Sequence, residues 1–233
     1  MAAPASESIP RPYRYERKFL VAELDASQLH HLVRRHPALF RPPYPPRYIN
    51  NLYLDSPDLE NYAANVGGQH QRRKLRVRWY GELFGAIAQP VLEIKLKDGL
   101  VGNKLSYPLP SFHLEPGLNQ RQLQALFRQA ELPAFLRQEL RDLQAVLCNR
   151  YYRWYYATPT GEFRATIDAR LSYYPLRHSN NRFRPVSHDY QNVILELKYE
   201  RDLDQQANRI AGFFPFRMTR SSKYVTGIER VFD

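Results

Sequence analysis

The chain has 233 residues, 43% of them hydrophobic and 24% charged, which favours a packed core and excludes global disorder. No apolar run approaches the ~18 residues of a membrane-spanning helix. A single cysteine, Cys148, excludes an intrachain disulfide and a multi-cysteine zinc site, and it fits a reducing, cytoplasmic compartment. The formal net charge is +11, and 27 of the 34 basic residues are arginine. This charge indicates either a basic surface that aids solubility or an anionic partner, such as nucleic acid, anionic lipid or a phosphorylated small molecule. Composition alone does not choose between them.

The predicted elements mix strands with short helices. Residues 1–12 are expected to form a disordered lead, and residues 13–233 a single domain. In chain order, the first half predicts strand Tyr13–Leu20, helix Asp25–His36, a proline-rich connection Arg41–Arg47, strand Asn50–Leu54, helix Ser56–Val66, and strands Lys74–Tyr80 and Val91–Lys97. The second half predicts helices Leu118–Ala130 and Leu132–Leu147, strands Asn149–Tyr156, Phe163–Arg170 and Val193–Glu200, and helices Asp202–Phe213 and Ser222–Val231.

Most predicted strands have one apolar face and one charged face. In Lys74–Tyr80, for example, Leu75, Val77 and Trp79 alternate with basic residues. An ordinary antiparallel sheet with one face in water would give this alternation. The polar faces here are mainly Lys, Arg and Glu, however, and like charges on neighbouring strands repel each other. The alternative is a closed sheet whose charged faces line a wet tunnel.

Common catalytic motifs are absent from the sequence. There is no phosphate-binding glycine loop, no dinucleotide-binding motif, no zinc spacing and no convincing Ser/His/Asp arrangement. Three histidines share one predicted helix, where a solvated face is favoured over a metal site: His30, His31 and His36.

Three Glu-x-Lys pairs remain, each on one face of a predicted strand. Carboxylates suit a divalent metal and lysines suit phosphate oxygens. One such pair alone would be a surface salt bridge worth ~0–1 kcal/mol. Together with the neighbouring Lys-x-Arg-x-Arg, they favour a phosphate-binding wall. The pairs are Glu16–Lys18, Glu93–Lys95 and Glu196–Lys198.

The order and spacing of several segments resemble the VTC domain, the polyphosphate polymerase domain of the vacuolar transporter chaperone complex and its stand-alone bacterial relatives. That domain belongs to the triphosphate tunnel metalloenzymes, related to CYTH proteins. The resemblance covers about Tyr13 to Phe232. The segments are ERKFLV at Glu16, YLDSPDLENY at Tyr53, KLRVRWYG at Lys74, LEIKLK at Leu92, NRYYR at Asn149, RATID at Arg164, LELKYE at Leu195 and SKYVTG at Ser222.

The resemblance implies an α+β fold: an antiparallel eight-stranded β-barrel tunnel with flanking helices. It also implies a reaction, in which the γ-phosphate of ATP moves onto a growing polyphosphate chain and ADP is released. Glu196, and more weakly Glu16, would hold Mn²⁺ or Mg²⁺. The expected catalytic residues, which also contact phosphates, are Lys18, Arg76, Arg78, Lys95 and Lys223. Further phosphate or nucleotide contacts are expected from Lys104, Arg150, Arg164 and Lys198, and more weakly from Tyr152 and Ser222.

One position departs from the wider superfamily. Tunnel hydrolases and cyclases usually begin with Glu-x-Glu-x-Lys, whereas this chain has Arg14-x-Glu16-x-Lys18. The change removes one carboxylate and favours the polymerase branch over a triphosphatase or a cyclase.

The other readings are a metal-dependent triphosphatase, a non-catalytic polyphosphate or nucleotide sensor, and a nucleic-acid binder. A nucleic-acid binder is disfavoured because it needs exposed aromatic side chains for base stacking, whereas most of the 17 tyrosines are expected to lie in the tunnel wall and the core. Fungal relatives pass their polymer to a membrane channel, so a separate membrane partner is expected.

Overall fold

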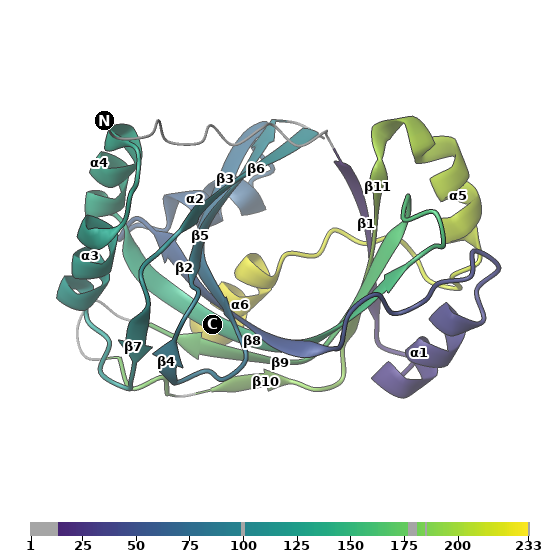
Figure 1. Cartoon of the computed structure of the whole chain (residues 1–233), viewed down its shortest axis with the longest axis horizontal. Helices are drawn as coiled ribbons and strands as arrows, with labels where there is room; N and C mark the ends of the chain where they lie inside the picture. The colour runs from purple at the N-terminus through teal and green to yellow at the C-terminus, as the bar shows by residue number, and fades with distance from the viewer. Residues whose placement is uncertain (1–13, 99–100, 177–180, 185, 233) are drawn as a thin grey trace, which may run out of the picture.

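The computed structural model describes residues 14–98, 101–176, 181–184 and 186–232. The predicted N-terminal lead lies outside these residues. Eight long strands form one strongly curled antiparallel sheet, in the order β1-β11-β9-β8-β2-β3-β5-β6 (Figure 1). Their bounds are β1 Arg14–Val21, β2 Arg47–Asp55, β3 Gln71–Tyr80, β5 Val91–Asp98, β6 Val101–Pro108, β8 Gln144–Ala157, β9 Arg164–Pro175 and β11 Val193–Glu200. The short β10 (Ser187–Asp189) pairs antiparallel with β9, and β4 (Gly85–Ile87) pairs with β7 (Phe112–Leu114).

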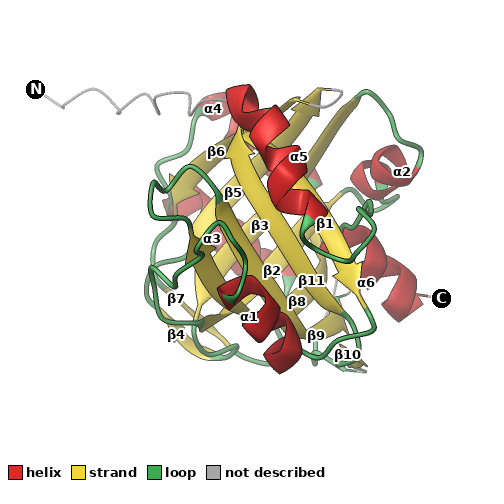
Figure 2. Cartoon of the chain, turned by 90° about the vertical axis from the view of Figure 1, so that its right-hand side faces the viewer, coloured by secondary structure: helices red, strands yellow, loops and turns green. Residues whose placement is uncertain are grey.

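Helices cover two regions of the outer face of this sheet (Figures 1 and 2). The helices α3 (Gln120–Gln129) and α4 (Ala134–Asp142) pack on β2, β3 and β5 around residues such as Trp79. On the other side, α1 (Ala26–Arg34) and α5 (Asp204–Gly212) pack on β1, β9 and β11, and the short η1 (Arg201–Leu203) leads into α5. The apolar strand faces therefore point outward against helices, as the alternation requires.

One helix lies on the inner face instead. The helix α6 (Lys223–Phe232) packs on β2, β8, β9 and β11 through Tyr224 and Ile228. Gly227 makes this close approach fit, because a Cβ there would lie 2.4 Å from Leu147 Cδ2 and 2.7 Å from Tyr173 Cδ1. The helix α2 (Glu60–Val66) lies beside it, and the buried Asp55 carboxylate accepts hydrogen bonds from Tyr224 and from the α2 backbone.

The antiparallel tunnel fold predicted from the sequence is confirmed. The charged strand faces turn inward, so the ordinary sheet with one face in water is excluded. β1 and β6 form the two edges of the curled sheet. The Lys95 Nζ of β5 reaches across to the Glu16 carboxylate of β1, at 2.8 and 3.0 Å. A side-chain ion pair thus helps to close the wall where the two edges approach each other.

Some element boundaries differ from the sequence prediction. β6 and the short β4, β7 and β10 were not predicted. The second of the paired helices ends at Asp142 rather than Leu147, and residues 144–147 belong to β8. Ala145, Val146 and Leu147 are all buried, and a short run that is apolar on every face does not separate helix from strand. The helix after Ser56 begins only at Glu60, because a turn precedes it in which Leu59 has a φ of 56°.

Candidate phosphate- and metal-binding site

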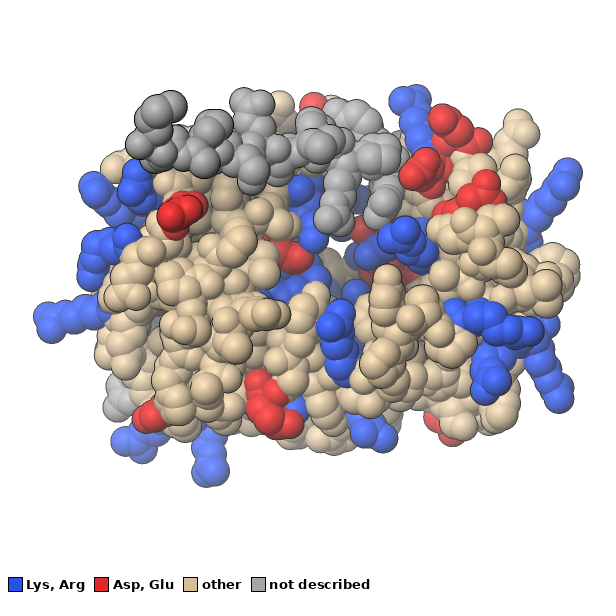
Figure 3. Space-filling model, in the orientation of Figure 1, with Lys and Arg blue, Asp and Glu red and all other residues tan. Residues whose placement is uncertain are grey.

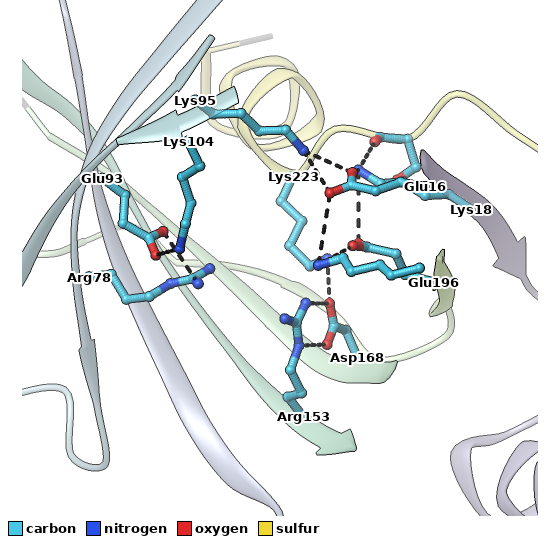
Figure 4. A network of polar contacts seen from close by, with 12 residues as sticks. Glu16, Lys18, Arg78, Glu93, Lys95, Lys104, Arg153, Asp168, Glu196 and Lys223 are labelled. Atoms are coloured by element: carbon cyan, nitrogen blue, oxygen red, sulfur yellow. Dashed lines mark hydrogen bonds and ion pairs between the residues drawn. The ribbon is translucent and has the colours of Figure 1, made fainter. Parts of the chain in front are cut away.

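Basic side chains concentrate on the inner face of the sheet. All seven lysines of the chain project from this face or from the first turn of α6 toward it. In Figure 3, Lys and Arg side chains surround a central hollow in which acidic atoms are also visible. The close-up shows two walls of charged residues that face one another across this interior (Figure 4).

The first wall is centred on Glu93 of β5. Its carboxylate is 2.7 Å from Arg76 Nη2, 3.3 Å from Arg78 Nη1 and 2.8 Å from Lys104 Nζ. Burial raises the pKa of Glu93, but the three cations outweigh burial and hold this pKa well below its usual range. The Arg78 guanidinium is fixed further by Asn51 Oδ1 at 3.0 Å. Three cations share one carboxylate, so this Glu93 wall has positive charge left for phosphate oxygens.

The second wall holds Glu16 and Glu196 among lysines of β1, β5 and β11. Lys198 Nζ is 2.7 Å from Glu196, and Lys18 Nζ is 3.8 Å from Glu16 and 4.0 Å from Glu196. Burial and the Glu196 charge raise the pKa of Glu16, but Lys95, Lys198 and Lys18 outweigh them and lower it to about 2. Lysines likewise hold the pKa of Glu196 well below its usual range, against burial. Both carboxylates are therefore ionised at neutral pH.

A buried triad supports the second wall from below. Asp168 on β9 is fully buried and pairs with Arg153 of β8 at 2.5 and 2.6 Å. Its second oxygen lies 2.6 Å from Lys223 Nζ at the start of α6. The triad therefore joins β8, β9 and α6, and it fixes the Lys223 ammonium at the interior surface.

Most of the predicted phosphate ligands meet in this interior. Lys198, Ser222 and Lys223 lie on it, and Arg164 stands beside Lys198 in the strand register on the same face, exposed at the end of β9. The structure brings most of these residues together from β1, β3, β5, β6 and β11 and from the start of α6. The predicted residues gathered here are Lys18, Arg76, Arg78, Lys95, Lys104, Lys198, Ser222, Lys223 and the carboxylates Glu16 and Glu196.

Two predicted ligands lie on the opposite side of the sheet. Arg150 is paired in register with Asn50, which faces the outer core, and its guanidinium stacks 3.9 Å from the Tyr48 ring centroid. The Tyr152 ring lies 4.8 Å from Tyr48, also on the outer face. The inner positions of β8 are Tyr151 and Arg153 instead. The physical reason is strand alternation: residues 150 and 153 differ by an odd number and must face opposite sides.

Sequence reasoning left several interior residues out of the predicted site. Lys74 and Glu93 belonged to the charged patterns that favoured a phosphate-binding wall, and Asp168 lay on a charged strand face. None of the three was among the residues assigned to the site. Each of the three lies two or four residues from Arg76, Lys95 or Arg164 on the same strand, so strand alternation places it on the same face as an assigned residue. Arg153 had no such signal, because both faces of β8 carry arginine and tyrosine. Only its partner Asp168 identifies the inner face.

The fold implies a divalent metal, which needs acidic ligands in the interior. Within the described part of the chain, no group of three or more His, Cys, Asp or Glu could hold a metal. Mg²⁺, however, is commonly bound by one or two carboxylates together with substrate phosphates and water. Glu196 and Glu16 share Lys18 and Lys198 as neighbours, and both are ionised. This pair fits a metal that arrives with a phosphate chain.

An antiparallel tunnel whose interior combines cations with a few ionised carboxylates defines a structural class, and several solved structures share this fold. A putative adenylyl cyclase from Hippeastrum, described as having a dominant triphosphatase activity, is 14% identical with a TM-score of 0.56 over 94% of this chain and 96% of that one. A putative adenylate cyclase from Vibrio parahaemolyticus is 13% identical with a TM-score of 0.53, over 92% and 98%. Another from Bacillus halodurans is 14% identical with a TM-score of 0.51, over 94% and 99%.

Within this class, the family is defined by sequence. The VTC domain model matches residues 13–232, and the chain belongs to the VTC domain family. No curated protein sequence matches the chain. No helix of the described residues is long and apolar enough to cross a membrane.

Proposed function

We propose that this protein is an ATP-dependent polyphosphate polymerase. The bond between the β- and γ-phosphates of ATP breaks, the γ-phosphorus bonds to a terminal oxygen of the growing chain, and ADP leaves. The main support is the VTC domain, which extends over nearly the whole chain. The cation-lined interior agrees with it, since phosphoryl transfer depends on positioning and charge neutralisation more than on a protein nucleophile.

The two walls suggest different roles in this reaction. On the Glu93 wall, Arg76, Arg78 and Lys104 would bind phosphate oxygens, because three cations surround a single carboxylate. On the opposite wall, Lys18 and Lys95 would hold a second set of phosphates. The fixed positions of these side chains would keep donor and acceptor in line for transfer.

Glu196, with Glu16 beside it, would hold Mn²⁺ or Mg²⁺. Bound there, the metal would neutralise phosphate charge and orient phosphate oxygens. In this role the carboxylates would exchange their contacts with Lys198 and Lys95 for the metal. The displaced lysines would then be available to the phosphate chain.

A triphosphatase is the second candidate, because the Hippeastrum protein is described as one. A non-catalytic polyphosphate or nucleotide sensor would use the same cations without turnover. The proposed partners are ATP and inorganic polyphosphate, with a separate membrane protein to receive the polymer. The proposed location is the cytoplasm. Nucleic acid is disfavoured, because the cations with assigned roles point into the interior rather than over an exposed stacking surface.

The test is to incubate the purified protein with ATP and Mn²⁺, then with Mg²⁺, and to resolve the products on a gel. A polymer ladder with stoichiometric ADP supports the polymerase. Free phosphate without polymer would replace it with a triphosphatase, and tight polyphosphate binding without turnover would leave a sensor.

Two variants test the assigned residues. Glu196→Ala should abolish metal-dependent turnover with the fold intact. Arg76→Ala combined with Arg78→Ala should weaken phosphate binding strongly, and wild-type turnover in both variants would show that the site is misplaced.

A further inference from the structure

Three lysines stand side by side on the inner face. The strand register places Lys74 of β3 opposite Lys95 of β5, and Lys95 opposite Lys104 of β6. Like charges in directly opposed positions destabilise a sheet unless counter-charges separate them. Lys95 has the Glu16 carboxylate at 2.8 Å, and Lys104 has Glu93 at 2.8 Å. Two of the three lysines are thus neutralised by the protein itself.

Lys74 is the exception in this row. No carboxylate of the described residues lies within ion-pair distance of its ammonium. Its Nζ instead donates to the Ser222 hydroxyl at 2.6 Å. That hydroxyl also accepts the Val225 backbone N–H at 3.3 Å, at the first turn of α6. A neutral hydroxyl satisfies one of the three ammonium donors but leaves the charge uncompensated.

The charged groups that act most strongly on Lys74 are all cations. Burial is the main cause that lowers the pKa of Lys74, and Lys18 of β1, Lys95 and Lys97 of β5 and Arg76 of its own strand add to it. Together they bring this pKa to about 7. An anion at this position would restore the full charge of Lys74 and relieve the repulsion within the row.

We propose that Lys74 and the Ser222 hydroxyl form an additional subsite for one phosphate group of the substrate chain, against the first turn of α6. The inference deepens the proposed function, because it names a specificity-determining residue of the same interior. The ligand class is a condensed phosphate with at least three phosphoryl groups, long enough to reach the Glu93 wall and this subsite together. Lys74 takes up a proton as the phosphate binds.

The test measures binding of inorganic tripolyphosphate to the whole chain by calorimetry, in two buffers with different ionisation enthalpies. Lys74→Met should weaken binding about 10-fold or more, because it removes a charge-assisted hydrogen bond. It should also remove most of the proton uptake. Lys74→Arg should keep the affinity within about 3-fold of wild type, since the cation is retained. Neither measurement requires turnover, so a failure of the polymerase proposal leaves this test intact.

Lys97→Met is the matched control. Lys97 lies on the same strand face, two residues beyond Lys95, and the pKa of Lys97 is also lowered, mainly by burial. Its removal should change the affinity by less than about 3-fold. An equal loss in both variants would overturn the subsite, because it would reflect only the net charge of the interior. Wild-type affinity in Lys74→Met would overturn it directly.

Two further readouts separate ligand binding from a structural role. The melting temperature of ligand-free Lys74→Met should rise, because the substitution removes a desolvated charge that has no carboxylate partner. A fall would indicate that Lys74 supports the fold and would contradict the proposal. In amine-reactive labelling at pH 7, Lys74 should react fastest of the seven lysines, and tripolyphosphate should protect it. Unchanged labelling in the presence of tripolyphosphate would also overturn the subsite.

Discussion

The two faces of the curled sheet are built from the same strands but have opposite chemistry. The outer face carries the two larger apolar clusters, under α3 and α4 and under α1 and α5. The inner face and the first turn of α6 that lies on it carry every lysine of the chain, together with ionised carboxylates. Buried ion pairs contribute little net stability, because desolvation offsets much of their attraction. The outer face therefore supplies most of the stability, and the inner face is organised for binding anions.

The largest expected effect comes from breaking the buried triad. Asp168→Ala would leave Arg153 buried without its counter-charge, at a cost of about 3–5 kcal/mol in the free energy of unfolding. The matched control is Glu82→Ala, which removes the exposed pair with Arg150 on the outer face. That control should cost less than about 1 kcal/mol. Denaturant unfolding of both variants measures the difference, and equal costs would contradict the contrast between the faces.

The second prediction separates the two inner walls. Glu196→Gln should reduce metal-dependent turnover by about 10²–10³-fold, as expected for loss of one electrostatic contact in the transition state. Glu93→Gln should lower the KM for ATP, because it increases the net positive charge of the phosphate-binding wall. It should leave the midpoint of the metal titration unchanged, because Glu93 contacts three cations and lies on the wall opposite Glu16 and Glu196. Kinetics at varied Mn²⁺ concentration check both variants. If Glu93→Gln shifted the midpoint of the metal titration, the metal would bind at the Glu93 wall, which would contradict the proposed site at Glu196 and Glu16.

The third prediction compares arginines on opposite faces. Arg78→Ala should weaken tripolyphosphate binding by about 10- to 100-fold, the range expected for a lost charge-assisted contact. Arg150→Ala should leave the dissociation constant within about 2-fold, because this arginine stacks on Tyr48 outside the tunnel. Calorimetric titration distinguishes them. Strong weakening by Arg150→Ala would restore its sequence-predicted role.

The smallest expected effect is on stability, in a comparison of α6 on the inner face with α5 on the outer face. Gly227→Ala in α6 would force a methyl group against Leu147 and Tyr173, and overpacking of this kind costs about 1–3 kcal/mol. Gly212→Ala at the end of α5 meets open space, so it should leave stability unchanged or raise it by less than about 1 kcal/mol. Thermal unfolding compares them. A neutral Gly227→Ala would mean that α6 is not tightly seated on the inner face.

Much of the fold could be predicted from the sequence, because alternation is a local property. In β3, the pattern of Leu75, Val77 and Trp79 separates the apolar side from the charged side without knowledge of any other strand. The Asp25 cap likewise marks the start of α1 through a local hydrogen bond, from the Gln28 N–H to the Asp25 carboxylate at 2.8 Å. β6 was missed because Val101–Pro108 mixes Gly, Asn and Ser into its pattern, and only pairing with β5 identifies it.

The sequence by itself determined which residues share a face and that several charged faces recur along the chain. The tertiary structure decided which face of β8 turns inward, because that choice depends on pairing between distant strands. A register shift between β8 and β9, where Arg170 has a φ of 55°, lets Asp168 meet Arg153. The tertiary structure also decided that α6 lies on the inner face of the sheet. There Ser222 forms a hydrogen bond with Lys74, which is 148 residues away in the sequence. The two-residue alternation of side chains along a strand determines locally which residues share a face. Which face turns inward depends on the curvature of the sheet and the register of its strands, and these arise from non-local contacts.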